Sequence, residues 1–250
     1  MASNKGYTNE KLIVEALNNK KYSEINSNLQ TFIRDLFSYQ DEDCLIKCEQ
    51  IDGVYKPDIA ITYKGITYNV SIKSGRADML HGENIKTFIP FLRRMGVSEE
   101  TLKTIVLFHY GDGTYDGSGP KRETSYNAYM MYRNRIKKAN EELNKEEDFI
   151  DKVLERIMYQ GVDPHAPGVD FLYFGTPEYG VAVSKKQIAT YIRKRNWKFL
   201  NNLHIGPIFI KPHARYANTS IKSQTLRDKV HCYWPHLCED LDRISKRYTF

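Results

Sequence analysis

The sequence predicts an α/β fold with a mixed central sheet flanked by helices, and three patterns support it. Apolar residues recur at helical spacing in residues 8–20 and about 24–38. Residues 56–73 alternate between apolar and polar types, as two neighbouring strands do. Residues 104–110 form the continuous apolar run of a buried strand. At 250 residues and 41% hydrophobic content the chain can bury a full core as one large domain.

The helices on both sides of the predicted hairpin are defined by their apolar stripes. The first helix carries Leu12 and Ala16 on its stripe, and the second carries Leu29, Phe32, Ile33 and Leu36. A strand near residues 45–51 leads into the hairpin. After the hairpin, the segment of about 79–95 places Ile85, Phe88, Ile89 and Leu92 at helical spacing, which predicts a third helix.

The hairpin carries its polar chemistry on one face. A two-residue turn at Lys64-Gly65 pairs Tyr63 with Ile66 and, counted outward, Asp58 with Ser71. One face is then apolar and consists of Ile59, Ile61, Tyr63, Ile66, Tyr68, Val70 and Ile72. The other face consists of Asp58, Ala60, Thr62, Thr67, Asn69, Ser71 and Lys73. Opposed side chains lie about 5 Å apart and diagonal ones about 7 to 8 Å apart. Asp58 and Lys73 are therefore either solvated charges or a pair that converges on a divalent metal ion and a phosphate.

The residues Pro57-Asp58, the hairpin and Ser71-Ile72-Lys73 together resemble the PD-(D/E)xK nuclease superfamily. The resemblance implies a restriction-endonuclease-like core in which Asp58 binds Mg²⁺ and Lys73 acts on the phosphate or the attacking water. Ser71 stands where most members carry an acid. In one branch of type II restriction endonucleases the motif reads S-x-K and the following helix supplies the carboxylate, and this sequence is similar to that branch.

Glu83, ten positions after Lys73, is the candidate for the displaced carboxylate because it falls near the start of the third predicted helix. By this resemblance Asp58 and Glu83 are the metal ligands, and Ser71 orients Glu83 or a metal-bound water. Two alternatives stay open. In the first alternative, Glu83 only stabilises the free backbone N–H groups of a first helical turn. In the second, Ser71 is an engineered replacement of an acid, which leaves the enzyme inactive.

Positive charge in the second half of the chain predicts contacts with DNA. The net charge is 37 − 31 = +6, which suits a polyanionic partner. The candidates are Lys185, Lys186, Arg193, Lys194 and Arg195 in a helix at 184–198, and Lys211, His213 and Arg215 at alternate positions of a strand. A long helix at 125–144 is also basic but is partly balanced by acids. We therefore expect a nuclease core of about 8–110 and DNA-recognition additions of about 111–250.

Two further patterns each have a metal-binding and an ordinary interpretation. Cys44, Cys48, Cys232 and Cys238 are either ligands of a structural zinc or reduced thiols, and neither pair has C-x2-C spacing. Residues 111–120 alternate acids and hydroxyls as a calcium loop does, but lack the closing glutamate, and glycine and aspartate also suit a surface loop.

The sequence favours a Mg²⁺-dependent type II restriction endonuclease that acts as a homodimer on double-stranded DNA. No apolar run is long enough to cross a membrane, and no signal peptide is visible, so a cytoplasmic location is expected. Two alternatives remain. One is a repair or junction-resolving nuclease with the same core, and the other is a DNA-binding relative that has lost catalysis.

Overall fold

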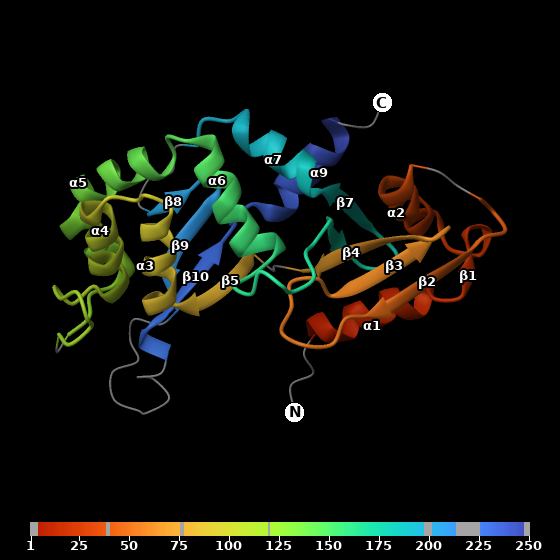
Figure 1. Ribbon diagram of the computed structural model, residues 1–250, viewed down its shortest axis with the longest axis horizontal. Coiled ribbons are helices and arrows are strands. Elements are labelled where there is room, and N and C mark those ends of the chain that lie inside the picture. Colours follow the sequence, from red (N-terminus) through yellow and green to blue (C-terminus); the bar gives the residue numbers. More distant parts are fainter. Residues whose placement is uncertain are drawn as a thin grey trace. The chain divides into compact units, whose positions relative to one another are not determined.

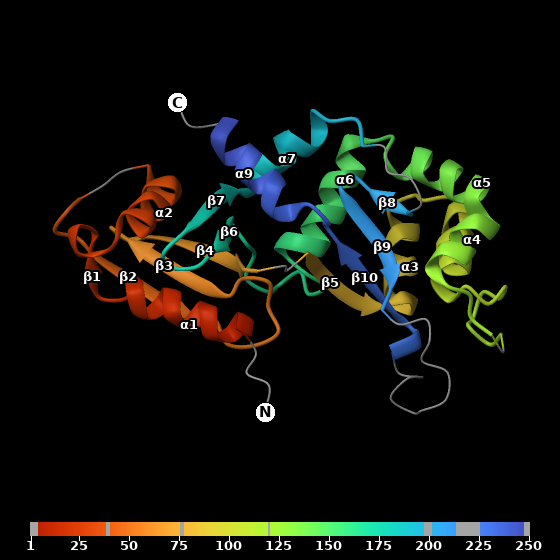
Figure 2. The same cartoon turned by 180° about the vertical axis from the view of Figure 1, so that it is seen from behind.

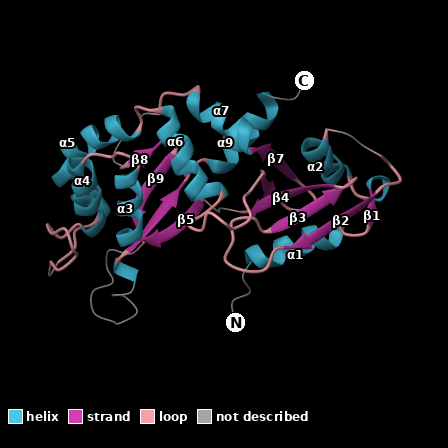
Figure 3. Ribbon diagram, viewed as in Figure 1, coloured by secondary structure: helices cyan, strands magenta, loops and turns pink. Residues whose placement is uncertain are grey.

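The computed structural model describes residues 5–38, 41–75, 78–119, 121–197, 202–213 and 226–247. It is an α/β structure with two sheets, each flanked by helices (Figures 1 and 3). The chain forms two compact units, of which the first comprises residues 1–77, 154–194 and 236–250 and the second residues 78–153 and 195–235. This division differs from the expected one near residue 110. Among the described residues, every helix is too short or too polar to span a lipid bilayer.

The first unit is built on a six-stranded mixed sheet of order β1-β2-β3-β4-β6-β7. Its elements are α1 (Lys5–Leu17), β1 (Lys20–Lys21), η1 (Tyr22–Glu24), α2 (Ser27–Phe37), β2 (Leu45–Gln50), β3 (Ile59–Tyr63), β4 (Ile66–Lys73), η2 (Glu155–Tyr159), β6 (Phe171–Gly175), β7 (Gly180–Ser184), α7 (Lys185–Arg193) and α9 (Leu237–Arg247). Among the described strand pairs of this sheet, only the pairing of β4 with β6 is parallel. Helices α7 and α9 lie beside β7 in both Figure 1 and Figure 2. The mixed sheet flanked by helices is therefore confirmed.

The hairpin of β3 and β4 has the predicted register. Tyr63 pairs with Ile66 and Ile59 with Val70. The two turn residues, Lys64 and Gly65, have φ values of 51° and 78°. This left-handed backbone gives a two-residue turn whose twist matches that of the strands. The predicted apolar face forms part of the core: Ile59, Ile61, Tyr63, Val70 and Ile72 are buried, Tyr68 is partly buried and Ile66 is exposed.

We expect Gly65→Ala to lower the free energy of unfolding by about 1 kcal/mol, because alanine is strained at a φ of 78°. A Cβ atom at this position meets nothing within 4 Å, so the loss is conformational rather than steric. Urea unfolding measures it. Gly65→Asn is the matched control and should lose less, since asparagine tolerates the left-handed region. Equal stability of all three proteins would show that the turn does not need this conformation.

Helices α1 and α2 cover one face of this sheet. The predicted stripe of α2 is confirmed, because Leu29, Phe32, Ile33 and Leu36 are all buried in the same core. The predicted stripe of α1 is wrong at Leu12, which is 48% exposed. The buried stripe of α1 consists of Asn9, Ile13 and Leu17, spaced four residues apart. An amide thus occupies a buried position near the start of α1.

The second unit contains an antiparallel sheet of order β5-β10-β9-β8. Its elements are β5 (Met79–Asn84), α3 (Ile85–Arg94), α4 (Glu99–Tyr110), α5 (Ser125–Leu143), α6 (Glu147–Leu154), β8 (His204–Ile205), β9 (Ile208–Pro212) and β10 (Lys229–Tyr233). Helix α3 contacts β5 and β10, α4 contacts β9, and α5 packs along α4. The long helix predicted at 125–144 is confirmed by α5.

Two predicted elements of the second unit are wrong. Residues 104–110 belong to helix α4 rather than to a strand. Ser98 caps α4 by accepting a hydrogen bond from the backbone of Thr101, and Gly111 ends it in the left-handed region. Helix α4 is buried on most sides, so its apolar run looks the same as that of a buried strand. The third helix begins only at Ile85, and residues 79–84 form strand β5 instead.

Candidate active site

Asp58 lies just before β3, and three donors converge on one of its carboxylate oxygens. The Ser71 hydroxyl donates to Oδ2 over 3.0 Å, and the backbone N–H of Ile72 donates to the same oxygen over 2.5 Å. The Lys73 ammonium nitrogen lies 3.8 Å from Oδ2. The Asp58 carboxylate is thus held by β4, as the predicted register implies. Ser71 orients Asp58, whereas the sequence predicted that it orients Glu83 or a water.

Lys73 ends β4 and faces Asp58 across the hairpin. Its strand pairs in parallel with β6, where Lys73 is opposite Phe174. The side chains of Lys73 and Asp58 are 23% and 21% exposed, so solvent and ligands reach both. Ser71 is buried. The pair is therefore a partly desolvated charge pair at a strand end, where a phosphate interacts more strongly with an ammonium group than it does in open water.

A buried hydrogen bond brings α1 to this end of the sheet. The Asn9 side-chain amide donates to the backbone carbonyl of Gly175 over 2.9 Å. Gly175 directly follows Phe174, the neighbour of Lys73 in β6. Its φ is 155°, and a Cβ atom there would lie 2.2 Å from the carbonyl oxygen of Tyr179, so only glycine fits. The start of α1 is therefore fixed to the end of β6, the strand that pairs with the Lys73 strand β4.

Glu10, the residue after Asn9, is a second carboxylate whose pKa the charges of this site affect. Burial raises the pKa of Glu10, and the negative charge of Asp58 raises this pKa further. The positive charge of Lys73 and a hydrogen bond with the Gln50 side chain both act in the opposite direction on it. The charges of both Asp58 and Lys73 therefore act on the Glu10 carboxyl group. Gln50, at the end of β2, orients this carboxyl group through the hydrogen bond.

The raised pKa of Glu10 predicts a pH-dependent stability. The folded pKa exceeds the unfolded value of 4.5, so between these two values the folded protein binds more protons and its stability falls as pH rises. Above that window the metal-free protein carries the full penalty of an ionised Glu10. We expect Glu10→Gln to be more stable than the original protein at pH 7, and to match it below pH 4.5. Urea unfolding at several pH values measures this.

Glu15→Gln is the matched control for this experiment. Glu15 lies on the same helix, is largely exposed and faces Lys11 at 3.8 Å. It should show no stabilisation at pH 7. If Glu10→Gln has no higher free energy of unfolding than Glu15→Gln at any pH, the negative charge of Asp58 does not act on Glu10.

The candidate ligands for a magnesium ion are the carboxylates of Asp58 and Glu10, and the Gln50 side chain is hydrogen-bonded to Glu10. Mg²⁺ is typically bound by one or two carboxylates, with water and phosphate oxygens as the remaining ligands. Within the described ranges no three or more His, Cys, Asp or Glu side chains are grouped to hold a metal. A magnesium ion held by these two carboxylates would take its remaining ligands from water and from a substrate.

Glu83, the acid predicted from the sequence, belongs to the second unit. It lies in β5, two residues before α3, with its side chain 5% exposed. One carboxylate oxygen lies 3.1 Å from Nε2 of His81, and the other accepts a hydrogen bond from the Thr87 hydroxyl over 2.8 Å. These partners give Glu83 a structural role in joining β5 to α3. Its role as a metal ligand with Asp58 stays a prediction.

The predicted DNA-contacting residues are divided between the two units. Lys185, Lys186, Arg193 and Lys194 belong to α7 or its C-terminal cap in the first unit. Lys185 pairs with Glu155 and lies over the Tyr159 ring at 5.0 Å, so it also holds η2 in place. Lys186, Arg193 and Lys194 are exposed. These three cations suit phosphate contacts better than Lys185 does.

Arg195, Lys211 and His213 belong to the second unit, and Arg215 lies outside the described residues. Lys211 lies 5.1 Å over the Phe209 ring, and burial lowers its pKa. Nδ1 of His213 lies 3.2 Å from Nδ1 of His231 on the neighbouring strand. Lys211 and His213 therefore contact neighbouring side chains of their own sheet, in addition to carrying polar groups that suit a DNA contact.

The cysteines and the glycine-rich loop have no described metal-binding geometry. All four cysteines are unbridged, with Cys48 buried in the first unit and Cys232 in the second. In the loop, the Asp112 carboxylate accepts hydrogen bonds from Thr114 and from the backbone of Gly119. Asp112 thus folds the loop on itself, as the surface-loop interpretation expects.

Sequence patterns alone missed Glu10, Gln50 and Asn9. The available signal was Asn9, a polar residue at a stripe position of an otherwise apolar helix face, with an acid next to it. In comparisons with known proteins, no family model matches this chain, and no curated protein is significantly similar to it.

Proposed function

We propose that this protein is a Mg²⁺-dependent endonuclease that hydrolyses phosphodiester bonds in double-stranded DNA, of the site-specific type II class with a restriction-endonuclease-like core. One observation carries the proposal: the Asp58 carboxylate and the Lys73 ammonium group lie 3.8 Å apart at one end of the first sheet, and both charges act on the pKa of Glu10. Two acids and a lysine are the groups that a metal-assisted phosphodiester hydrolysis requires.

Each side chain has a distinct role in the proposed reaction. Asp58 and Glu10 would hold Mg²⁺, which when bound neutralises phosphate charge and activates a water molecule. Ser71 and the Ile72 N–H fix the Asp58 carboxylate, so its orientation is set before substrate binds. The Lys73 ammonium donates hydrogen bonds to a phosphate oxygen as negative charge develops there. Gln50 holds Glu10 in place through its side-chain amide.

Incubation of the protein with supercoiled plasmid, with Mg²⁺ and with a chelator, tests the proposal. We expect discrete linear fragments that appear only with the metal. Cuts confined to branched or damaged DNA would favour a repair or junction-resolving nuclease. Metal-independent binding with no cleavage under any condition would contradict an endonuclease and favour a relative that only binds DNA.

A homodimer is part of the proposal. Cutting both strands of a duplex requires two active sites, and a palindromic target matches a two-fold protein axis. We expect sedimentation of the protein on its cleaved duplex to give two copies per DNA. A single copy per DNA that nicks only one strand would contradict a homodimer that cuts both strands at a specific site.

A further inference from the structure

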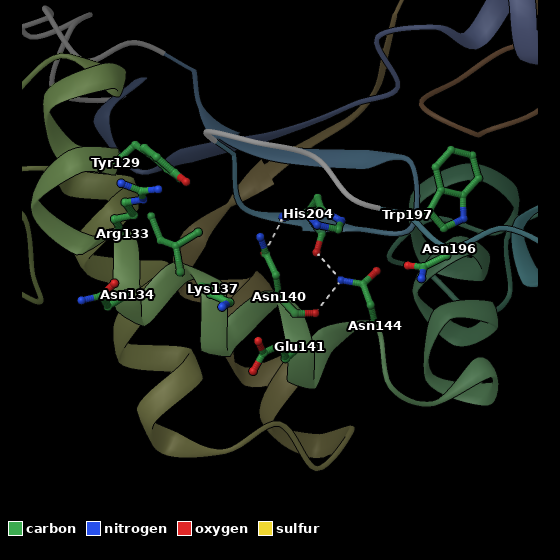
Figure 4. A pocket seen from close by; sticks show the side chains of 11 residues that line it. Tyr129, Arg133, Asn134, Lys137, Asn140, Glu141, Asn144, Asn196, Trp197 and His204 are labelled. Atoms are coloured by element: carbon green, nitrogen blue, oxygen red, sulfur yellow. Dashed lines mark hydrogen bonds between the residues drawn. The ribbon is translucent and has the colours of Figure 1, made fainter.

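The second unit contains a cavity of about 820 Å³ that the proposed cleavage site does not use. It lies between α5 and the segments around β8 (Figure 4). Its lining residues are Tyr129, Arg133, Asn134, Ile136, Lys137, Asn140, Glu141, Asn144, Asn196, Trp197 and His204. Cavities of this size hold small organic ligands, which are gripped by apolar walls and a few placed polar groups.

One wall of the cavity is a polar stripe of helix α5. Tyr129, Arg133, Lys137, Asn140 and Asn144 follow one another at intervals of three or four residues, so they share one side of the helix. Arg133 and Lys137 are exposed one turn apart, and Glu141 is the only acid among the described residues that line the cavity. Two cations against one carboxylate give this wall a net attraction for an anion such as a phosphate.

The far end of the stripe is fixed by side-chain amides. Asn140 donates to the carbonyl of Asn202 and accepts from the N–H of His204, both over 3.0 Å. Asn144 donates to the carbonyl of His204 over 3.0 Å and accepts from the N–H of Gly206 over 2.6 Å. Figure 4 shows these amides between α5 and the chain at His204. The cavity is thus built before a ligand arrives, which lowers the entropic cost of binding.

An aromatic surface completes the cavity. Trp197 lines it, and the Arg195 guanidinium lies 4.9 Å from the centre of the Trp197 ring. This cation–π contact helps to hold the indole in place. Tyr129 adds a second ring from α5. His204 is buried, and burial lowers its pKa, so the histidine stays neutral and leaves Arg133 and Lys137 as the cations.

We propose that this cavity binds a nucleotide, with the base against Trp197 and the phosphate on Arg133 and Lys137. An aromatic ring stacks on a base whatever its identity, and paired cations bind a phosphate through charge-assisted hydrogen bonds. The nucleotide comes either from solution or from a DNA strand in which one nucleotide is unstacked. The inference rests on the second unit alone and does not depend on hydrolysis in the first.

Tryptophan fluorescence of the whole protein in a chelating buffer tests this inference, because cleavage is then suppressed. The chain has two tryptophans, and Trp234 is buried, so quenching by a stacked base reports on Trp197. The probes are a 5′-mononucleotide, a matched duplex and the same duplex with one unpaired base. We expect saturable quenching by the mononucleotide, by the mismatched duplex or by both, and less by the matched duplex.

The variant Arg133→Gln/Lys137→Gln should weaken this binding about tenfold or more, because it removes two charge-assisted contacts. Lys138→Gln is the matched control: Lys138 is exposed on the same helix but does not line the cavity. It should bind as the original protein does. Quenching by the mononucleotide identifies a free-nucleotide site, and quenching by the unpaired base alone identifies a site for DNA. No saturable quenching by any probe, or equal losses in the double variant and the control, would overturn the proposal.

Discussion

Alanine at Asp58 or at Lys73 is expected to lower the rate of Mg²⁺-dependent cleavage by about 10³-fold or more. Removal of a single group that stabilises developing charge typically costs about 10²- to 10³-fold, and Asp58 is both a metal ligand in the proposed site and the partner of Lys73. Single-turnover cleavage of a short duplex at saturating protein measures the chemical step. Both side chains are partly exposed at a strand end, so the variants should fold.

Lys47→Ala provides the matched control. Lys47 lies in β2 of the same sheet, pairs with Glu49 at 3.0 Å and is 63% exposed, so it tests the loss of one lysine from an exposed ion pair. Its cleavage rate should change by less than about twofold. DNA binding in chelator should be similar for all these variants. A Lys73→Ala protein that cuts at the control's rate would remove Lys73 from the mechanism.

The hairpin was predictable because its information is local. The Lys64-Gly65 turn fixes the register, and the register alone decides which side chains oppose one another. Asp58 and Lys73 are 15 positions apart, yet the alternation along both strands places them on one face. In the structure their charged atoms lie 3.8 Å apart, and their convergence on a metal ion and a phosphate stays a prediction. The presence of the sheet and of α2 follows from periodicity in the same way.

The role of Glu10, the acid on α1, in the candidate site could not be predicted from the local sequence pattern. The charges of Asp58 and Lys73 act on Glu10, and Asn9, the residue before it, is hydrogen-bonded to Gly175, a partner 166 positions away in the sequence. Such a contact depends on how α1 packs on the finished sheet, and no periodicity within α1 encodes it. Helix α4 shows a second limit. A buried helix and a buried strand both read as continuous apolar runs, so only the caps at Ser98 and Gly111 distinguish them.

Glu10→Gln is expected to lower Mg²⁺-dependent cleavage by about 10²-fold or more, because it removes one of two carboxylates while keeping the size of the side chain. The metal-free protein should at the same time become more stable at pH 7, since burial first, and then the negative charge of Asp58, make the ionised Glu10 carboxylate unfavourable. Loss of activity with a gain of stability is the behaviour of a functional residue held at a cost to the fold. Calorimetric titration with Mg²⁺ should show weaker binding in parallel.

Glu83→Gln separates the two candidate acids. Glu83 is buried against His81 and Thr87, so its replacement should lower the free energy of unfolding by about 1 to 3 kcal/mol through the loss of hydrogen bonds. If Glu10 is the second ligand, Mg²⁺ affinity per folded molecule is unchanged in Glu83→Gln and reduced in Glu10→Gln. The reverse pattern would return the ligand to Glu83, as the resemblance to the S-x-K branch implies, and would leave Glu10 as a neighbour that only tunes the field around Asp58. Glu10→Asp completes the set: partial recovery of metal binding over Glu10→Gln would show that the carboxylate itself, rather than the packing of α1, is what the site requires.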